Sequence, residues 1–537
     1  MSKRASGILL HPSSLPGKFG IGCIGKNAMD FIDYLADCGF SLWQTLPLGP
    51  TGYGDSPYAA VSAFAANPLL IDLEDLYGRY HFDPKFLELP DSVKKTESID
   101  FGPLVEWKIP LLEKIADFFL NTGNDKTEFE LFKKENKYWL EDYALFMSIK
   151  RFYDKKAQDE KVYGAASTWM HFWPDSLKKH EESALNKWKL EHKDELERSS
   201  AIQYFFYSQW KALKEYANQK GISIIGDIPI FVAADSSDLW ANQELFQLDK
   251  DSVPSSCAGV PPDYFSKTGQ LWGNPLYLWQ AHLDSDFAWW KSRIKRILTL
   301  CDYVRIDHFR GFESFWQIPS TEKTAINGKW VKAPGKELFL ALKKEFPDLP
   351  VLAEDLGEIT KEVIDLRDNF NLPGMKILQF AFSAQEAESS GMNNPFLPHR
   401  YPEHCVCYTG THDNDTSQGW LLSLSKSPEG IKTLSLVAQY LFGRNFGDKE
   451  IELMLQNGEL AKKMIVSAIS SPAFMSIIPM QDILFLDSSA RMNMPSTTGK
   501  NWCWRMSGES FSDASSYLEQ FISREELKNL NFIYGRS

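Results

Sequence analysis

The sequence lacks any long hydrophobic run. No stretch approaches the roughly 20 apolar residues that a helix needs to span a bilayer. Residues 1–10, MSKRASGILL, contain neither an apolar core of signal-peptide length nor a transit-like composition. These absences argue against an integral membrane protein and a membrane partner, and they predict a soluble protein.

Paired cysteines are also lacking. The seven cysteines are odd in number and widely spaced, and no C-x-x-C motif occurs among them. Neither a disulfide framework nor a zinc site is therefore indicated. Cys405 and Cys407 alternate along one apolar segment, where two small buried side chains are the simplest interpretation. We expect a reduced protein of the cytoplasm.

Basic clusters are absent as well. The chain has 58 Lys and Arg against 71 Asp and Glu, a formal net charge of −13, which argues against a nucleic-acid partner. An acidic surface is compatible with a monomer or a weak homo-oligomer. Aromatic residues, by contrast, are abundant, with 17 Trp, 20 Tyr and 36 Phe. Such rings stack on sugar faces, although any single ring is more simply explained by core packing.

The order of apolar runs predicts an α/β fold. Short apolar segments alternate with helical patterns, as in a parallel sheet with crossover helices. We expect helices at 27–38, 202–220, 289–300 and 336–345, and core strands at 7–10, 40–46, 223–227, 303–307, 351–354, 375–380, 405–409 and 474–479. Eight strands close a (β/α)8 TIM barrel, so residues 1–537 are predicted to form one barrel.

Two connections are too long for ordinary loops. Residues 80–200, between the second and third strands, are charged and helical in period, notably at 129–150 and 177–198. We interpret this segment as an inserted helical subdomain. Residues 229–286, between the third and fourth strands, have a non-periodic pattern rich in Pro, Gly and aromatic residues. A loop of this kind above a barrel mouth is predicted to bind substrate.

Three of the predicted strands run directly into acids. Asp307 ends one strand, Glu354 ends the next, and Asp413 follows a third in the segment TGTHDND at 409–415. A carboxylate at the end of an apolar strand is costly unless it has partners or performs chemistry. Barrel enzymes keep their catalytic residues at the carboxyl ends of the strands, so this pattern predicts an acidic active site.

The chemistry of these acids suggests glycoside processing. Arg305 and Asp307 share one face of a strand, and a guanidinium keeps a carboxylate ionised, as a nucleophile requires. Glu354, on the adjacent strand, is a candidate acid and base, since retaining glycosidases hold two carboxyls roughly 5–5.5 Å apart. Its pocket should raise its pKa. Asp413, with His412, could hydrogen-bond sugar hydroxyls as positive charge develops on the anomeric carbon.

Each assignment has a structural alternative. Asp307 and Arg305 could form a purely structural ion pair, and Glu354 could belong to an exposed acidic turn. His412, Asp413 and Asp415 could hold a metal, although one histidine and two acids within four residues are a weak ligand set.

Longer motifs carry a resemblance to a known family. From residue 6 to about residue 504 the chain resembles the 4-α-glucanotransferases, also called amylomaltases or disproportionating enzymes, which are relatives of the α-amylases. The matching segments are GILLHPSSLP at 7–16, GDSPY at 54–58, SAFAANP at 62–68, GDIPIFV at 226–232, GVPPDYFSKTGQLWGNP at 259–275, RIDHFRG at 305–311, AEDLG at 353–357 and TGTHDNDT at 409–416.

The resemblance implies roles for individual residues. Asp307 matches the family's nucleophile, Glu354 its acid/base and Asp413 its transition-state-stabilising carboxylate. The implied sugar contacts are Tyr58, Asp227, Asp263, Gln270, Trp272, Arg305, His308 and His412. The short remainder after the eighth strand resembles the transferases, which have no C-terminal β-domain. Donors would be α-1,4-glucans and maltooligosaccharides, glucose would be an acceptor, and no cofactor or metal is expected.

Three other functions remain open from the residues alone. A hydrolase of the α-amylase type would use the same acids on the same linkage. A glucan-binding protein could keep the barrel without catalysis, although three costly acids argue against that interpretation. A metal-dependent barrel enzyme is a third alternative.

Overall fold

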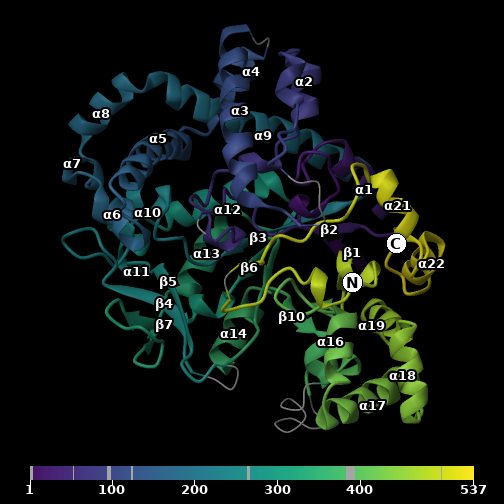
Figure 1. The fold of residues 1–537 in the computed structure, drawn as a ribbon. Coiled ribbons are helices and arrows are strands. Elements are labelled where there is room, and N and C mark those ends of the chain that lie inside the picture. The colour runs from purple at the N-terminus through teal and green to yellow at the C-terminus, as the bar shows by residue number, and fades with distance from the viewer. Residues whose placement is uncertain are drawn as a thin grey trace.

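The fold is built on a sheet of parallel strands that closes on itself (Figure 1). This computed structural model describes residues 4–52, 54–93, 98–122, 125–262, 266–382, 394–497 and 499–537, with only the backbone of 514–516. Eight parallel strands pair in the order β10-β11-β12-β1-β2-β3-β6-β9. The Ala353 amide of β9 donates to the Pro373 carbonyl, directly before β10, at 2.9 Å and joins the two ends. The strands are β1 (Ala5–Leu9), β2 (Leu42–Gln44), β3 (Ser223–Pro229), β6 (Tyr303–Asp307), β9 (Val351–Ala353), β10 (Gly374–Ile377), β11 (Cys405–Tyr408) and β12 (Met475–Pro479).

All eight predicted strands are present, and the expected TIM barrel is confirmed. Most ends differ from the prediction by one or two residues, but the strand expected at 375–380 ends at Ile377 and continues as the 3₁₀ turn η8 (Leu378–Phe382). The carbonyls of Phe380 and Ala381 accept from the Asn394 side chain at 3.3 and 3.1 Å, so they bond to a side chain instead of a neighbouring strand. An apolar run alone does not reveal such a partner.

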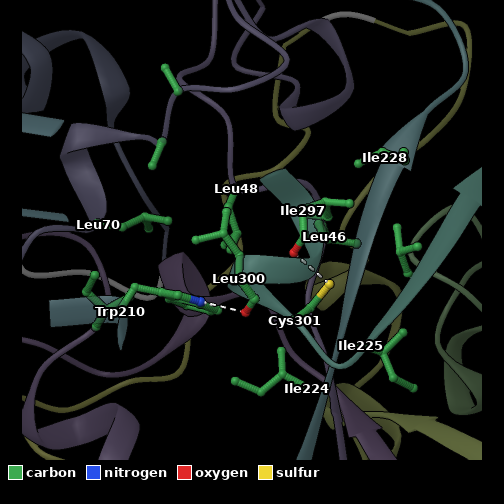
Figure 2. Close-up of a cluster of buried hydrophobic side chains, with 14 of the residues drawn as sticks. Leu46, Leu48, Leu70, Trp210, Ile224, Ile225, Ile228, Ile297, Leu300 and Cys301 are labelled. Carbon is green, nitrogen blue, oxygen red and sulfur yellow. Dashed lines mark hydrogen bonds between the residues drawn. The ribbon is translucent and has the colours of Figure 1, made fainter. Parts of the chain in front are cut away.

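The barrel strands are apolar because both of their faces are covered. Ile225, Val304, Val406 and Ile477 are completely buried. Figure 2 shows part of this core, where Leu46, Leu48 and Ile224 lie among residues of the strands and covering helices. In the same cluster the Trp210 indole donates to the Leu300 carbonyl at 2.7 Å, which satisfies its one polar group. The covering helices include α1 (Lys26–Asp37), α9 (Lys193–Gln219), α12 (Ala288–Leu300), α13 (Gly335–Glu345), α14 (Lys361–Asn369) and α19 (Glu459–Ser470).

The connection between β2 and β3 is mostly helical, as expected. The helix predicted at 129–150 is interrupted at Asn136, whose side chain donates to the Phe132 carbonyl and accepts from the Trp139 indole. The boundaries 80–200 stay a prediction. The helices of this connection that precede α9 are α2 (Leu73–Tyr80), α3 (Phe101–Thr122), α4 (Lys126–Glu135), α5 (Lys137–Asp159), α6 (Trp169–Phe172), α7 (Asp175–Lys178) and α8 (Glu182–Glu191).

A second, antiparallel sheet lies beside the barrel mouth and was not predicted. Its strand order is β5-β4-β7-β8. β4 and β5 fall within the segment 229–286, which has the sequence pattern of a loop. They pair with each other, and β4 also pairs with β7, which comes later in the chain. Pairing between distant segments leaves little local signal, because each strand is short and its partner supplies the stabilisation. The strands are β4 (Ser256–Val260), β5 (Gln270–Pro275), β7 (Ser314–Pro319) and β8 (Lys329–Lys332).

Helices also follow β11 and β12. α16 (Ser417–Leu424), α17 (Pro428–Phe442) and α18 (Asp448–Gln456) precede α19, and α20 (Met480–Ile483), α21 (Phe511–Leu518) and α22 (Arg524–Ile533) follow β12. No sheet strand follows β12 in the part of the chain that the structure describes. Among the described helices, none combines the length and apolar character needed to cross a membrane.

Candidate active site

The predicted acids meet at the carboxyl edge of the barrel. Asp307 is the last residue of β6, Glu354 directly follows β9, and Asp413 lies in the loop after β11. β6 and β9 are hydrogen-bonded neighbours, and β11 is two strands further round the closed sheet. Carboxyl ends of parallel strands share one edge, so these three acids lie at the mouth of the barrel.

A cleft of about 480 Å³ opens at this edge. Its walls come from the segment that follows β2, from the ends of β3 and β6, and from β5 of the second sheet. The loops after β11 and β12 complete them. The residues that line it are Ser56, Tyr58, Ala59, Pro229, Ile230, Phe231, Ala233, Ala234, Gln270, Trp272, Gly273, Asn274, Asp307, His308, His412, Asp413, Asn493 and Trp502. Two of the three acids therefore face the cleft directly, together with most of the predicted sugar contacts.

A buried guanidinium links the acids of β3 and β6. One nitrogen of Arg305 donates to both carboxylate oxygens of Asp227, at 2.9 and 2.7 Å, and the other donates to Asp307 at 2.8 Å. Tyr58 completes the group, since its hydroxyl donates to Asp227 at 2.8 Å. Burial raises the pKa of the Asp227 carboxyl, and the charge of Arg305 opposes that shift.

The exposures within this group differ sharply. The side chains of Arg305 and Asp227 are 4% and 0% exposed, whereas that of Asp307 is 32% exposed. Arg305 thus contacts Asp307 from the protein interior, and Asp307 itself lines the cleft. Asp227, predicted as a sugar contact, lies beneath the surface and reaches the cleft only through Tyr58 and Arg305.

Glu354 lies beside Asp307 and is partly exposed, although it is not among the residues that line the cleft. Its two carboxylate oxygens accept backbone amides, from His308 at 2.7 Å and from Leu356 at 2.8 Å. His308 has a left-handed backbone (φ 57°), an uncommon conformation for a residue other than glycine. Burial, followed by the charge of Asp307, raises the pKa of Glu354 to about 8, against the opposing effects of Arg305 and the two amides. The carboxyl therefore keeps its proton at neutral pH.

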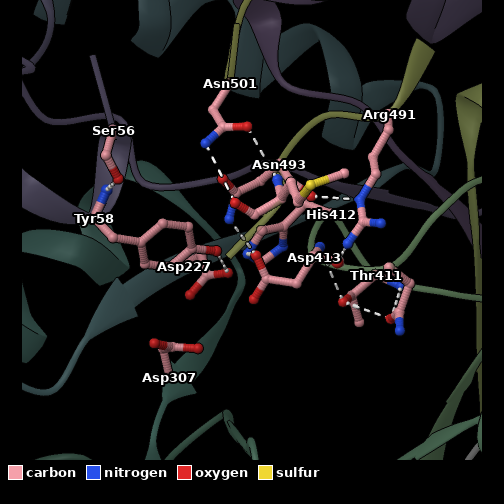
Figure 3. A network of polar contacts seen from close by, with 12 residues as sticks. Ser56, Tyr58, Asp227, Asp307, Thr411, His412, Asp413, Arg491, Asn493 and Asn501 are labelled. Carbon is pink, nitrogen blue, oxygen red and sulfur yellow. Dashed lines mark hydrogen bonds and ion pairs between the residues drawn. The ribbon is translucent and has the colours of Figure 1, made fainter. Parts of the chain in front are cut away.

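Asp413 is held by residues that follow the eighth strand (Figure 3). Asn493 donates to its carboxylate at 2.6 Å, and Arg491 donates to its backbone carbonyl at 2.5 Å. The His412 Nε2 lies 3.5 Å from the same carboxylate oxygen. The His412 ring stacks on Tyr58 with 5.0 Å between centroids and an interplanar angle of 18°. Asp413 and Tyr58 are thereby fixed relative to each other across one corner of the cleft.

Asn493, Arg491 and Trp502 are site residues that the sequence reasoning missed. No acid ends the eighth strand, so this segment carries none of the strand-end signal that marked the other three. Its position directly after a barrel strand was the available indication, because such segments all emerge at the catalytic edge.

The second sheet contributes Gln270 and Trp272 to the cleft. The Trp272 indole donates to the Gln270 side chain at 3.1 Å, and its ring meets that of His308 edge-on at 4.7 Å. Trp272 is 38% exposed, which leaves part of the ring free for contact. Asp263, also predicted to contact sugar, lies outside the described residues, as do Tyr264 and Phe265.

The structural alternatives for these acids are weakened by their contacts. Asp355, not Glu354, forms the structural pair: it bonds to Arg367 and accepts the Met375 amide at 2.7 Å. Asp415 accepts from the Ser488 hydroxyl at 2.6 Å and the Thr416 amide, away from Asp413. Within the described ranges no group of three or more His, Cys, Asp or Glu residues is arranged to hold a metal ion.

The closed parallel barrel and its cleft define the chain as an enzyme of the (β/α)8 class. The 4-alpha-glucanotransferase family model matches residues 10–511. The chain therefore belongs to the 4-alpha-glucanotransferase family, and the expected family and enzyme class are confirmed.

Individual relatives match the sequence of this chain over nearly their whole length. The chain is 45% identical to a 4-alpha-glucanotransferase of Thermus thermophilus over 94% of this chain and 95% of that protein. It is 43% identical to one of Streptococcus pneumoniae over 100% and 98%. Among solved structures, it is similar to an amylomaltase of Streptococcus agalactiae in complex with acarbose, with a TM-score of 0.87, 37% identity and full coverage of both chains.

Replacement of Arg305 by lysine tests the buried bridge. One ammonium group cannot reproduce the two-sided contact with Asp227 and Asp307, so one buried carboxylate loses its partner. We expect Arg305→Lys to lower the free energy of unfolding by roughly 2–4 kcal/mol, measured by urea denaturation.

Arg198→Lys is the matched control, since Arg198 makes one partly exposed contact with Asp117 at 3.1 Å. Its effect should stay below about 0.5 kcal/mol. Equal effects of the two replacements would contradict the importance of the Arg305 bridge.

Proposed function

We propose that this enzyme transfers a segment of an α-1,4-glucan to the 4-hydroxyl of glucose or of another α-glucan, with retention of configuration. Asp307 is the nucleophile, Glu354 the acid and base, and Asp413 the transition-state stabiliser. The observation that carries this assignment is the contrast between neighbouring acids: Asp307 is bound to Arg305, while desolvation and the charge of Asp307 raise the pKa of Glu354 to about 8. Two adjacent carboxyls in different protonation states are what double displacement requires.

The first step breaks the glycosidic bond. The protonated Glu354 gives its proton to the glycosidic oxygen as the bond to the anomeric carbon breaks, and the leaving sugar departs with a free 4-hydroxyl. Asp307 supplies an electron pair to the anomeric carbon and forms a covalent glycosyl-enzyme. Arg305 donates a hydrogen bond to one oxygen of Asp307 and holds this carboxylate in place for the attack.

The second step reverses the roles. Glu354, now deprotonated, takes the proton from the 4-hydroxyl of an acceptor, whose oxygen attacks the anomeric carbon and releases Asp307. The bond between Asp307 and the sugar, formed in the first step, is broken in the second. Glu354 regains the proton that it gave up, so the enzyme returns to its starting protonation. Two inversions give net retention.

Asp413 stabilises the positive charge that develops on the sugar ring in both transition states. Its carboxylate is 47% exposed at the side chain and keeps one oxygen directed to the cleft beside His412. A fixed negative group near the developing charge lowers the barrier without reorganising during the reaction.

Transfer instead of hydrolysis requires an acceptor site that disfavours water. Trp272 is a suitable platform, because its ring is partly exposed, stands beside His308 and borders the same cleft as Asp307. Glucose and maltooligosaccharides stacked there would reach the glycosyl-enzyme before water. A cytoplasmic location fits the seven free cysteines.

Maltotriose tests the reaction and the acids together. The unaltered enzyme should convert maltotriose into glucose and a ladder of longer maltooligosaccharides, resolved by chain-length chromatography. Asp307→Asn, Glu354→Gln and Asp413→Asn should each lower the rate by at least about 1000-fold, since each removes a role that no other residue fills. The far-UV circular dichroism spectrum should not change. Products no longer than maltotriose would identify a hydrolase instead.

The pH dependence of the reaction tests the protonation of Glu354. A raised pKa means that the acid form persists to higher pH, so kcat/KM should stay high through neutrality and fall about tenfold per pH unit above about 8. Because Asp307 and Glu354 interact, this limb reports the pair. A decline that begins near pH 5, with the fold intact, would contradict the role of Glu354.

Trp272→Ala tests the acceptor platform. We expect the ratio of transfer to hydrolysis to fall about tenfold, with bond cleavage less affected, as judged from the released glucose and the longer products of maltotriose. Trp272→Phe, which keeps a ring, should largely preserve the ratio. Leu271→Ala is the matched control, because Leu271 is similarly exposed on the opposite face of β5. An unchanged ratio in Trp272→Ala would refute the platform.

A further inference from the structure

A buried carboxylate lies under the loop that carries Asp413. Asp482 belongs to α20, directly after β12, and is 3% exposed. It does not line the cleft, so it contacts no substrate. Burial raises the pKa of Asp482, and its hydrogen bonds oppose that shift. A buried acid is costly unless it is fully partnered. Among the described residues, the side chain of Asp482 bonds to Thr409 and Ser417, which flank one loop.

Those partners stand at the two ends of the loop. The Thr409 hydroxyl, just after β11, donates to Asp482 Oδ2 at 2.6 Å. Ser417, the first residue of α16, donates its hydroxyl to the same oxygen at 2.7 Å and its amide to Oδ1 at 2.7 Å. Thr409 and Ser417 are both completely buried. Asp482 therefore fastens the points where the loop leaves the strand and enters the helix.

His412 and Asp413 lie between these two points. Inside the loop, Thr411 and Asn414 bond to each other, and Gln379 donates to the Asp415 carbonyl at 2.8 Å. On the cleft side, Arg491 and Asn493 bind Asp413 itself. Asp482, Arg491 and Asn493 all come from the segment after β12. This segment therefore contacts both ends of the Asp413 loop and Asp413 itself.

We propose that Asp482 is a positioning residue that sets the height and direction of Asp413 at the cleft through Thr409 and Ser417. This inference rests on the proposed role of Asp413. Three short contacts to a carboxylate fix both loop ends, and a loop fixed at both ends has little freedom to displace the acid between them. Loss of the clamp should misplace Asp413 while leaving the remainder of the barrel edge in position.

The effect should appear in kcat. Asp413 is proposed to act on the developing charge of the transition state, so misplacing it weakens the transition state more than the bound substrate. We expect Asp482→Ala to lower kcat roughly 10- to 100-fold, with KM unchanged within about twofold. Asp482→Asn keeps an oxygen for the Ser417 amide and should give an intermediate rate.

A double-mutant cycle separates positioning from general support. Asp482→Ala is measured alone and combined with Asp413→Asn, with maltosyl fluoride as donor, because its good leaving group keeps slow variants measurable by fluoride release. If Asp482 acts through Asp413, its removal should change the rate less than about threefold once Asp413 is Asn. An equal loss in both backgrounds, or no loss in the single variant, would overturn the inference.

The same cycle distinguishes a failure of the proposed function. If Asp413→Asn alone has the rate of the unaltered enzyme, the role of Asp413 is wrong, whatever Asp482 does. Asp72→Ala is the matched structural control: Asp72 is a buried carboxylate that caps α2 and accepts the Asp75 amide at 2.8 Å. It should lower the thermal midpoint without changing kcat.

A second variant covers the case in which Asp482→Ala does not fold. Thr409→Val is nearly isosteric and removes one donor to Asp482 without removing the acid. It should lower kcat by about three- to tenfold with KM unchanged, and this loss should also disappear in Asp413→Asn. A Thr409→Val enzyme with full kcat would count against the clamp.

Discussion

The contact between Arg305 and two carboxylates is the interaction on which the site depends. A guanidinium that is 4% exposed needs partners for its charge, and the carboxyls of Asp227 and Asp307 supply them from β3 and β6. The charge of Arg305 lowers the pKa values of Asp227 and Glu354 against the larger effect of burial. One buried cation therefore joins two barrel strands and helps to give neighbouring acids different protonation states.

The site has two supporting layers with different origins. Beneath Asp307 and Tyr58, the support comes from the barrel strands, whose register is set by the closed sheet. Around Asp413, it comes from loops: Asn493 and Arg491 bind the acid and its carbonyl, and Asp482 binds both ends of its loop. A strand-end acid needs few contacts to hold it, whereas an acid in a loop needs partners from another segment.

The prediction from sequence succeeded where the signal was local. Apolar runs located the eight strands, and an acid at the end of an apolar strand located Asp307 and Glu354. It failed for β4, which pairs with β7 across β6, and for Asn493, whose partner Asp413 is 80 positions away in the sequence. Asp227 was placed at the sugar, but its side chain is buried beneath Tyr58 and Arg305. In each of these cases the decisive partner is distant along the chain.

The sequence by itself determined the class of fold, because strand periodicity is a property of short segments, and its motifs resembled those of the family. It also predicted that three acids lie at the carboxyl edge of the barrel. Only the tertiary structure decided which groups surround each acid, since desolvation and the pKa of a carboxyl depend on what lies near it in space. Only the tertiary structure, likewise, brought Asp482 under the Asp413 loop, through hydrogen bonds between residues more than sixty positions apart.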